Sequence, residues 1–191
     1  MKKFKITDLM VPLGEYVVIS EDANIYDAVL ALETSRARFD AGRHPHRAVL
    51  VMDRKGRVVG KLGQLDVLRS LEPMYAAMHK DSPGMAKFGF SREFLLSMIE
   101  AYRLFDKPFD DICRKACREK VSKYMHRPTE GEFIEAGASL DEAVHLLVVG
   151  HHQSLLVTRE KEIIGILRLT DVSAVVCDAM KKCTCNLQVE G

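Results

Sequence analysis

The chain has 191 residues, a length that suits one large domain or two small ones with a buried core. Its composition, 47% hydrophobic and 29% charged, is ordinary for a globular protein and excludes a disordered chain, a collagen and a coiled-coil rod. The 28 Lys and Arg residues nearly balance the 27 Asp and Glu residues, so the formal charge is +1. Duplex-binding proteins usually carry a clear basic excess, so nucleic acid is not an expected partner, although a local basic patch stays open.

The N-terminus and the cysteines indicate a cytoplasmic protein. The first ten residues, MKKFKITDLM, begin with charge but lack the apolar stretch of a secretion signal. No segment approaches the roughly 20 apolar residues that cross a bilayer. The five cysteines are odd in number and lack a secretion signal, which favours free thiols in a reducing compartment. We therefore expect a cytoplasmic protein with no membrane association.

The sequence contains an internal repeat, which decides the fold class. Residues 6–35 match residues 121–150 at an offset of 115, and later positions match at an offset of 105. The change of offset gives the first copy ten extra residues, in or near the polar segment 35–45, which is typical of a surface loop. The matched pairs include Met10 and Met125, Ala28 and Ala143, Leu50 and Leu155, Gly60 and Gly165, and Asp66 and Asp171.

Each copy predicts a strand, an amphipathic helix, two strands and a last helix. In the first copy these are a strand at Tyr16–Ile19, a helix with Ile25, Ala28, Val29 and Leu32 on one face, strands at Ala48–Met52 and Val58–Leu62, and a helix from Gln64. The second copy has them at Glu132–Glu135, Leu140–Leu147, Ser154–Thr158, Ile163–Leu167 and from Leu169, with Ser139 as N-cap. A half of about 60 residues buries little surface alone, so the two halves are expected to pack together.

The segment between the copies matches neither. Ser91 predicts the start of a helix with a single apolar face, which favours a core or dimer stripe; its residues are Phe94, Leu95, Met98, Ile99 and Tyr102. Pro108 at the first helical position predicts a second helix carrying Ile112, Ala116 and Val121. The predicted organisation is a first repeat at 1–72, a helical insert at 73–120, a second repeat at 121–180 and a tail at 181–191.

The repeated unit, closed in both copies by a glycine and an aspartate six residues later, resembles the CBS domain, named for cystathionine β-synthase. The resemblance implies an α+β fold in which two β-α-β-β-α repeats pack as a pseudo-twofold pair, and it implies a homodimer. Such pairs commonly bind adenosine-containing ligands in the cleft between the repeats. We therefore expect a regulatory module that binds AMP, ADP, ATP or S-adenosylmethionine and changes how a second copy or a protein target docks.

The resemblance assigns roles to residues at the end of each repeat. Asp66 and Asp171 are expected to accept hydrogen bonds from ribose hydroxyls. The family's phosphate-contacting Ser or Thr is replaced by Gly63 and by Arg168. Gly63 lets a backbone N–H approach a phosphate closely, whereas Arg168 either binds phosphate in a bidentate manner or fills the cleft. An alternative is that each aspartate only caps its helix.

Further ligand contacts are expected on the strands of each repeat. Arg47 and His152 precede the second strands and are candidates for phosphate binding, and Val18 and Ile134 on the first strands are candidates to flank adenine. His151 and His152 also follow a helix, whose C-terminus favours histidine. Arg47 belongs to a basic cluster with Arg43, His44 and His46, for which a solvated loop is the favoured interpretation.

Two other functions stay open. The replacement of Ser or Thr in both copies allows a structural, dimerising module with vestigial sites. Thiols at Cys113, Cys117, Cys183 and Cys185 allow a metal or redox sensor, although their spacing is not that of the usual zinc motifs, so no metal site is expected. The common catalytic motifs are absent from the sequence, and we expect a protein that is not an enzyme.

Overall fold

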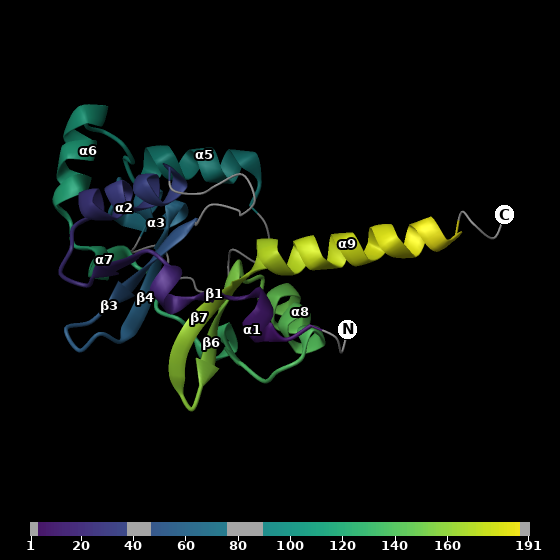
Figure 1. Cartoon of the computed structure of the whole chain (residues 1–191). Helices are drawn as coiled ribbons and strands as arrows, with labels where there is room; N and C mark the ends of the chain where they lie inside the picture. Colours follow the sequence, from purple (N-terminus) through teal and green to yellow (C-terminus); the bar gives the residue numbers. More distant parts are fainter. Residues whose placement is uncertain (1–3, 38–46, 76–89, 188–191) are drawn as a thin grey trace. The chain divides into compact units, whose positions relative to one another are not determined.

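The computed structural model describes residues 4–37, 47–75 and 90–187, and they form two compact units (Figure 1). The central unit contains residues 17–37, 47–75 and 90–127, and the terminal unit contains residues 4–16 and 128–187. Each unit combines one β-sheet with helices, so the predicted mixed α+β class is confirmed. Arg43, His44, His46 and the side chain of Cys185 lie outside the described residues.

The central unit is built on a three-stranded sheet in the order β2-β3-β4. The short strand β2 (Val18–Ser20) runs parallel to β3 (Ala48–Met52), which pairs antiparallel with β4 (Val58–Gly63). Helix α2 (Ile25–Ala37) and helix α3 (Gln64–Ser70) complete the repeat. The parallel pairing of β2 and β3 requires the α2 crossover between them, which is the β-α-β unit that the sequence predicts.

The terminal unit has a four-stranded sheet in the order β1-β7-β6-β5. Strand β5 (Phe133–Glu135) is parallel to β6 (Ser154–Arg159), and β6 is antiparallel to β7 (Glu162–Arg168). Helices α8 (Leu140–Val149) and α9 (Leu169–Leu187) follow the predicted positions. Ser139 caps α8 as predicted, because its hydroxyl accepts a hydrogen bond of 3.2 Å from the Glu142 N–H.

The start of the chain belongs to the terminal unit. Strand β1 (Val11–Pro12) and the 3-10 turn η1 (Leu13–Glu15) lie beside β7, and β1 pairs antiparallel with it. Helix α1 (Ile6–Leu9) contributes Ile6 to the core of this unit. Helix α7 (Val121–Tyr124) has the same relation to the central unit, where His126 forms a single bridge with Lys61 of β4. The second repeat's first strand is preceded by a further 3-10 turn, η3 (Glu130–Glu132).

Helices α5 and α6 of the insert belong to the central unit. Ser91 caps α5 (Arg92–Ala101) as predicted, with its hydroxyl 3.1 Å from the Phe94 N–H. The prediction for the next helix, α6 (Phe109–Arg118), is wrong at both ends. Pro108 is the N-cap rather than the first helical residue, and Glu119 is extended, so Val121 belongs to α7. Ile112 and Ala116 are buried as expected, and α6 packs against α2.

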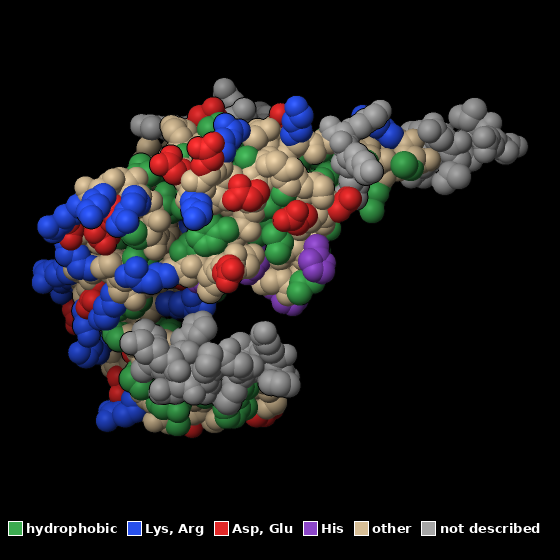
Figure 2. Space-filling view, turned by 90° about the horizontal axis from the view of Figure 1, so that it is seen from below, with side chains coloured by type: hydrophobic (Ala, Val, Ile, Leu, Met, Phe, Trp, Pro, Cys, Tyr) green, Lys and Arg blue, Asp and Glu red, His purple; other side chains and the backbone are tan. Residues whose placement is uncertain are grey.

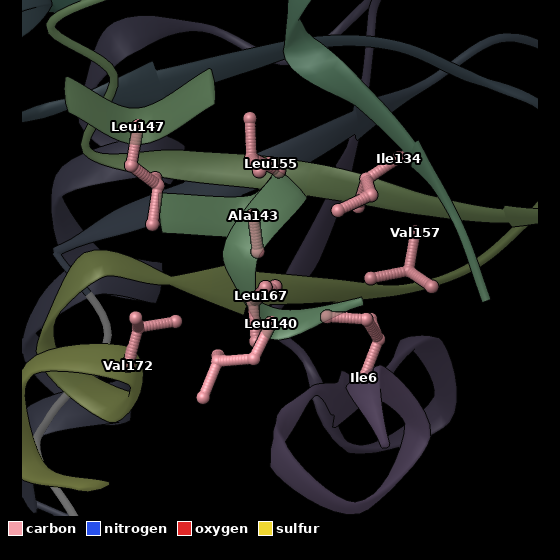
Figure 3. Packing of buried hydrophobic residues seen from close by; sticks show 9 residues of the cluster. All are labelled: Ile6, Ile134, Leu140, Ala143, Leu147, Leu155, Val157, Leu167 and Val172. Carbon is pink, nitrogen blue, oxygen red and sulfur yellow. The ribbon is translucent and has the colours of Figure 1, made fainter. Parts of the chain in front are cut away.

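Each sheet carries its own hydrophobic core. In the terminal unit nine side chains from α1, the sheet and helices α8 and α9 converge (Figure 3); they are Ile6, Ile134, Leu140, Ala143, Leu147, Leu155, Val157, Leu167 and Val172. The central unit has an equivalent cluster from α2, the sheet and α7: Ile25, Ala28, Leu32, Val49, Val51, Leu62, Val121, Tyr124 and Met125. The apolar helix faces predicted from the 3.6-residue period therefore form the cores.

The pairing registers correct one equivalence between the repeats. Ile19 pairs with Val51 and Ile134 pairs with Val157, so the strands β3 and β6 are related by 106 residues, and Leu50 corresponds to Leu156. The prediction that Leu50 matches Leu155 is wrong by one residue. The glycine pair keeps its offset, because Val51 pairs with Gly60 and Val157 with Gly165. The chain between the paired residues Val51 and Gly60 is therefore one residue longer than the chain between Val157 and Gly165.

A close approach explains why each repeat needs a glycine in its last strand. A Cβ atom on Gly60 would lie 2.6 Å from the Met125 Sδ and 3.1 Å from the His126 carbonyl oxygen. A Cβ atom on Gly165 would lie 2.6 Å from the Val11 carbonyl oxygen and 2.9 Å from the Met10 Sδ. The repeated methionine and the repeated glycine are therefore two sides of one contact.

We predict that Gly165→Ala costs more stability than Gly60→Ala. The new methyl group of Gly165→Ala meets a backbone oxygen that cannot move away, and we expect a loss of about 3 kcal/mol in unfolding free energy. The methyl group of Gly60→Ala first meets the flexible end of a methionine, and we expect a loss of about 1 kcal/mol. Chemical denaturation measures both. Gly137→Ala is the control, because a Cβ there has nothing within 4 Å.

A double-mutant cycle sharpens this prediction. Met125→Ala is expected to remove most of the penalty of Gly60→Ala, whereas Met10→Ala is expected to leave the penalty of Gly165→Ala in place. Equal rescue in the two repeats would contradict the assignment of the Val11 carbonyl as the limiting contact.

Candidate ligand sites at the ends of the repeats

In the first repeat, Asp66 stands in the first turn of α3 with its carboxylate fixed on both oxygens. The Gly63 N–H donates to the Asp66 Oδ2 at 2.8 Å, which is one half of a capping box. The Arg69 Nη1 donates to the Asp66 Oδ1 at 3.0 Å. The Arg69 side chain is 36% exposed and the Asp66 side chain is 11% exposed, so the cation reaches the surface while the carboxylate is largely buried. Asp66 thus caps its helix and has lone pairs beyond those that these two bonds use.

The structure brings Arg47 and Gly63 together beside this carboxylate. Gly63 ends β4 opposite Ala48, and a Cβ on it would lie 3.4 Å from the Arg47 carbonyl oxygen and 3.7 Å from the Asp66 Oδ2. Arg47 is exposed. Val18 lies on β2, next to β3, with 42% of its surface exposed. The four predicted residues of the first repeat therefore include a carboxylate in the first turn of α3, an exposed cation before β3 and an exposed apolar side chain on β2.

The corresponding position in the second repeat is chemically different. The Arg168 guanidinium holds Asp171 in a bidentate ion pair, with Nε to Oδ2 and Nη2 to Oδ1 both at 2.6 Å. The side chains of Arg168 and Asp171 are only 9% and 18% exposed. A fork-to-fork pair of this kind is strong and directional. Of the two roles left open for Arg168, the structure favours the one in which it fills the site.

Tyr16 completes the environment of this ion pair. It is buried at the end of η1, in the terminal unit. Burial raises the pKa of Tyr16 to about 12, while the Arg168 charge acts to lower it and the Asp171 charge acts to raise it. The phenol therefore stays neutral at physiological pH beside the two charges. The sequence analysis did not identify Tyr16, because its partners are more than 150 residues away.

Two predicted contacts of the second repeat are not placed as expected. Ile134 is 2% exposed and belongs to the core cluster, so its side chain faces the helices rather than solvent (Figure 3). By register, Phe133 is the counterpart of Val18. The offset of 106 likewise makes Gln153, not His152, the counterpart of Arg47. The His152 N–H instead donates to the Leu147 carbonyl at 3.0 Å, and its ring lies over Gly150.

Other predicted groups are placed apart from these sites. Cys113 and Cys117 are half-buried on α6, and Cys183 is exposed on α9. Within residues 4–37, 47–75 and 90–187, no three His, Cys, Asp or Glu side chains gather in a way that suits a metal ion. In the same part of the chain, no helix combines the length and apolar character needed to cross a bilayer.

The strand pairing, the glycine contacts and the aspartates at the helix starts agree with a family comparison. The CBS-domain model matches residues 6–73 and 121–178, more than half of the chain. The chain belongs to the CBS-domain family. A search of curated proteins finds no match.

Solved structures confirm the CBS fold. A CBS-domain-containing protein of unknown function from Kribbella flavida is 16% identical, with a TM-score of 0.56 over 91% of this chain and 98% of its own. CBSX2, solved in complex with AMP, is also 16% identical, with a TM-score of 0.57 over 92% of this chain and 97% of its own. The CBS domain of a bacterial CNNM/CorC family Mg²⁺ transporter, solved with ATP, has 16% identity and a TM-score of 0.56, covering 89% and 84%.

We predict that Arg168→Met destabilises the protein far more than Arg69→Met. The first substitution removes a nearly buried guanidinium that bonds both oxygens of Asp171, at a cost of about 3 kcal/mol. The second removes one bond from a more exposed arginine, and Asp66 keeps its bond from the Gly63 N–H, so we expect a cost of about 1 kcal/mol. Urea unfolding at neutral pH measures the difference. Equal losses would contradict the distinction drawn between the two aspartates.

Proposed function

We propose that this protein is a non-enzymatic regulatory module of the cytoplasm that binds an adenosine nucleotide through its first CBS repeat. The observation that carries the proposal is the carboxylate of Asp66, oriented by the Gly63 N–H and paired through its other oxygen with Arg69, whose side chain is 36% exposed. The structures of relatives in complex with AMP and with ATP support the ligand class.

The residues of the first repeat suit the parts of such a ligand. A ribose diol offers two O–H donors, and a carboxylate with two hydrogen bonds already made has about two lone pairs left to accept them. Arg47 supplies an exposed cation for phosphate, next to Gly63, where the missing side chain leaves room. Val18 supplies exposed apolar surface for a base.

The second repeat is proposed to bind no nucleotide in the wild-type protein. A ligand on Asp171 has to displace Arg168 from a bidentate, nearly buried pair, at a cost of several kcal/mol. A ligand on Asp66 competes with Arg69, which is 36% exposed and makes one hydrogen bond to a carboxylate that is 11% exposed. Displacing one bond from the more exposed arginine costs less than displacing two from Arg168, and this difference favours the first repeat. Regulation then follows because a bound ligand stabilises the conformation that binds it best.

Calorimetric titration with AMP, ADP, ATP and S-adenosylmethionine tests the proposal. We expect one ligand per chain, binding weakened at least tenfold by Asp66→Asn, and no change with Asp171→Asn. Asparagine keeps an oxygen that can accept the Gly63 N–H, so the helix cap is preserved. No binding of any of the four compounds, or loss of binding with Asp171→Asn alone, would overturn it.

An exposed apolar face on α5 favours a second function, self-association. None of the residues of α5 is buried, although the helix is capped and regular. Met98 of the predicted face is half-buried, whereas the other large apolar side chains of the helix are more than 40% exposed: Phe94, Leu95, Leu96 and Ile99, followed by Tyr102. Phe90 stacks on Phe94 with ring centroids 5.1 Å apart, which extends the face. Apolar patches of this kind mark interaction surfaces, and a second copy is the proposed occupant.

We predict that Leu95→Gln with Ile99→Gln converts a dimer into a monomer, because the pair removes the centre of the apolar face. Size-exclusion chromatography with light scattering measures the mass. Val148→Gln with Val149→Gln is the matched control, since these residues are 64% and 66% exposed on α8 of the other unit. A monomeric wild type, or a variant that stays dimeric, would contradict self-association through α5.

A further inference from the structure

The joint between α6 and α7 forms a basic pocket that lies outside the sites described above. The pocket measures about 520 Å³ and is lined by seven residues of the central unit: Asp111, Arg114, Lys115, Arg118, Glu119, Lys120 and Lys123. Five of these are cations and two are anions, so the lining carries +3, whereas the rest of the 191-residue chain carries −2. Figure 2 shows Lys and Arg side chains gathered on the left, the side on which α6 and α7 lie in Figure 1.

The helix pattern explains how these side chains meet. Asp111, Arg114, Lys115 and Arg118 follow the i, i+3, i+4, i+7 spacing and share one face of α6, while Ile112 and Ala116 face the core. A helix C-terminus favours cations, which accounts for Lys115 and Arg118 in its last turn. That effect does not account for Lys120, which lies beyond the end of α6 as the N-cap of α7.

The ion pairs leave an excess of positive charge in the pocket. Asp111 is paired with Arg114 at 2.9 Å, and Glu119 with Lys123 at 2.8 Å, so both carboxylates are neutralised. The Lys120 Nζ donates to the Asp22 carbonyl oxygen, a neutral group, and so keeps its charge. Lys115 and Arg118 are exposed and form no ion pair with another residue in the part of the chain that the structure describes. Three uncompensated cations therefore line one pocket.

The backbone under these cations is fixed. The Ile25 N–H donates to the Glu119 carbonyl at 2.9 Å, and the Val121 N–H donates to the Ala23 carbonyl at 3.0 Å. Lys120 itself pairs with Asn24 as an isolated bridge. The joint that carries Glu119 and Lys120 is thus attached to the segment before α2, and a ligand does not have to order it. Binding an anion then orders the side chains but not the backbone that carries them, which lowers the entropic cost.

We infer that this pocket binds the phosphate groups of a small, multiply phosphorylated ligand. Its volume lies in the range of small-molecule sites, and three free cations match an anion with several charges. No aromatic side chain is among the seven lining residues, so the stacking platform that single-stranded nucleic acid uses is missing. The inference does not depend on nucleotide binding at Asp66.

Inorganic tripolyphosphate is the probe that tests the inference, because it has the charge without a base or a ribose. Calorimetry at low and physiological salt is expected to show binding that weakens as salt increases. Lys115→Gln with Arg118→Gln is expected to reduce the affinity at least tenfold. Arg92→Gln with Lys107→Gln, which removes two exposed cations of the same unit outside the pocket, is expected to leave the affinity unchanged.

The outcomes separate the alternatives. No tripolyphosphate binding, or an equal loss in the two double variants, would overturn the site. Tighter binding of a twelve-nucleotide RNA that the Lys115 and Arg118 substitutions abolish would overturn the ligand class. Asp66→Asn is expected to retain full tripolyphosphate affinity, so that this site and the nucleotide site succeed or fail separately.

Discussion

The contact between a methionine and a glycine of the neighbouring strand is the constraint on which each repeat depends. The segment holding Met125 and His126 crosses Gly60 of β4, and the segment holding Met10 and Val11 crosses Gly165 of β7. No side chain fits between them, so the register of each crossing is fixed at the glycine. Gly63 and Arg168 follow three residues later, and the helices that carry the two aspartates begin directly after them.

Because the glycine crossing and the helix start have the same spacing in both repeats, the residues at the position between them can be compared directly. At the residue before the last helix, the first repeat has Gly63, which has no side chain. The second repeat has Arg168, which bonds both oxygens of Asp171. The same chain thus contains one carboxylate paired through one oxygen with an arginine that is 36% exposed and one held through both oxygens by a nearly buried arginine. One ligand per chain follows from this difference.

The helices and strands can be predicted from the sequence more accurately than the contacts between them. Ser91 and Ser139 were predicted as caps because their side chains act within one helical turn. The register of β3 against β6 was missed by one residue, because Val49 to Val51 and Leu155 to Val157 are apolar at every position and lack the alternation that fixes a register. The period of α5 identified an apolar face, but a pattern on one helix does not show what covers it. The sequence does not decide between phosphate binding and filling of the site by Arg168, because both roles require an arginine at this position.

The central claim is that the two repeats have the same fold but differ in ligand access. A crystal structure of the protein grown with AMP tests this claim most directly. We expect the nucleotide with its ribose on Asp66 and the Arg168–Asp171 pair intact in the same molecule. Nucleotide density on Asp171, with Arg168 turned away from it, would contradict the account.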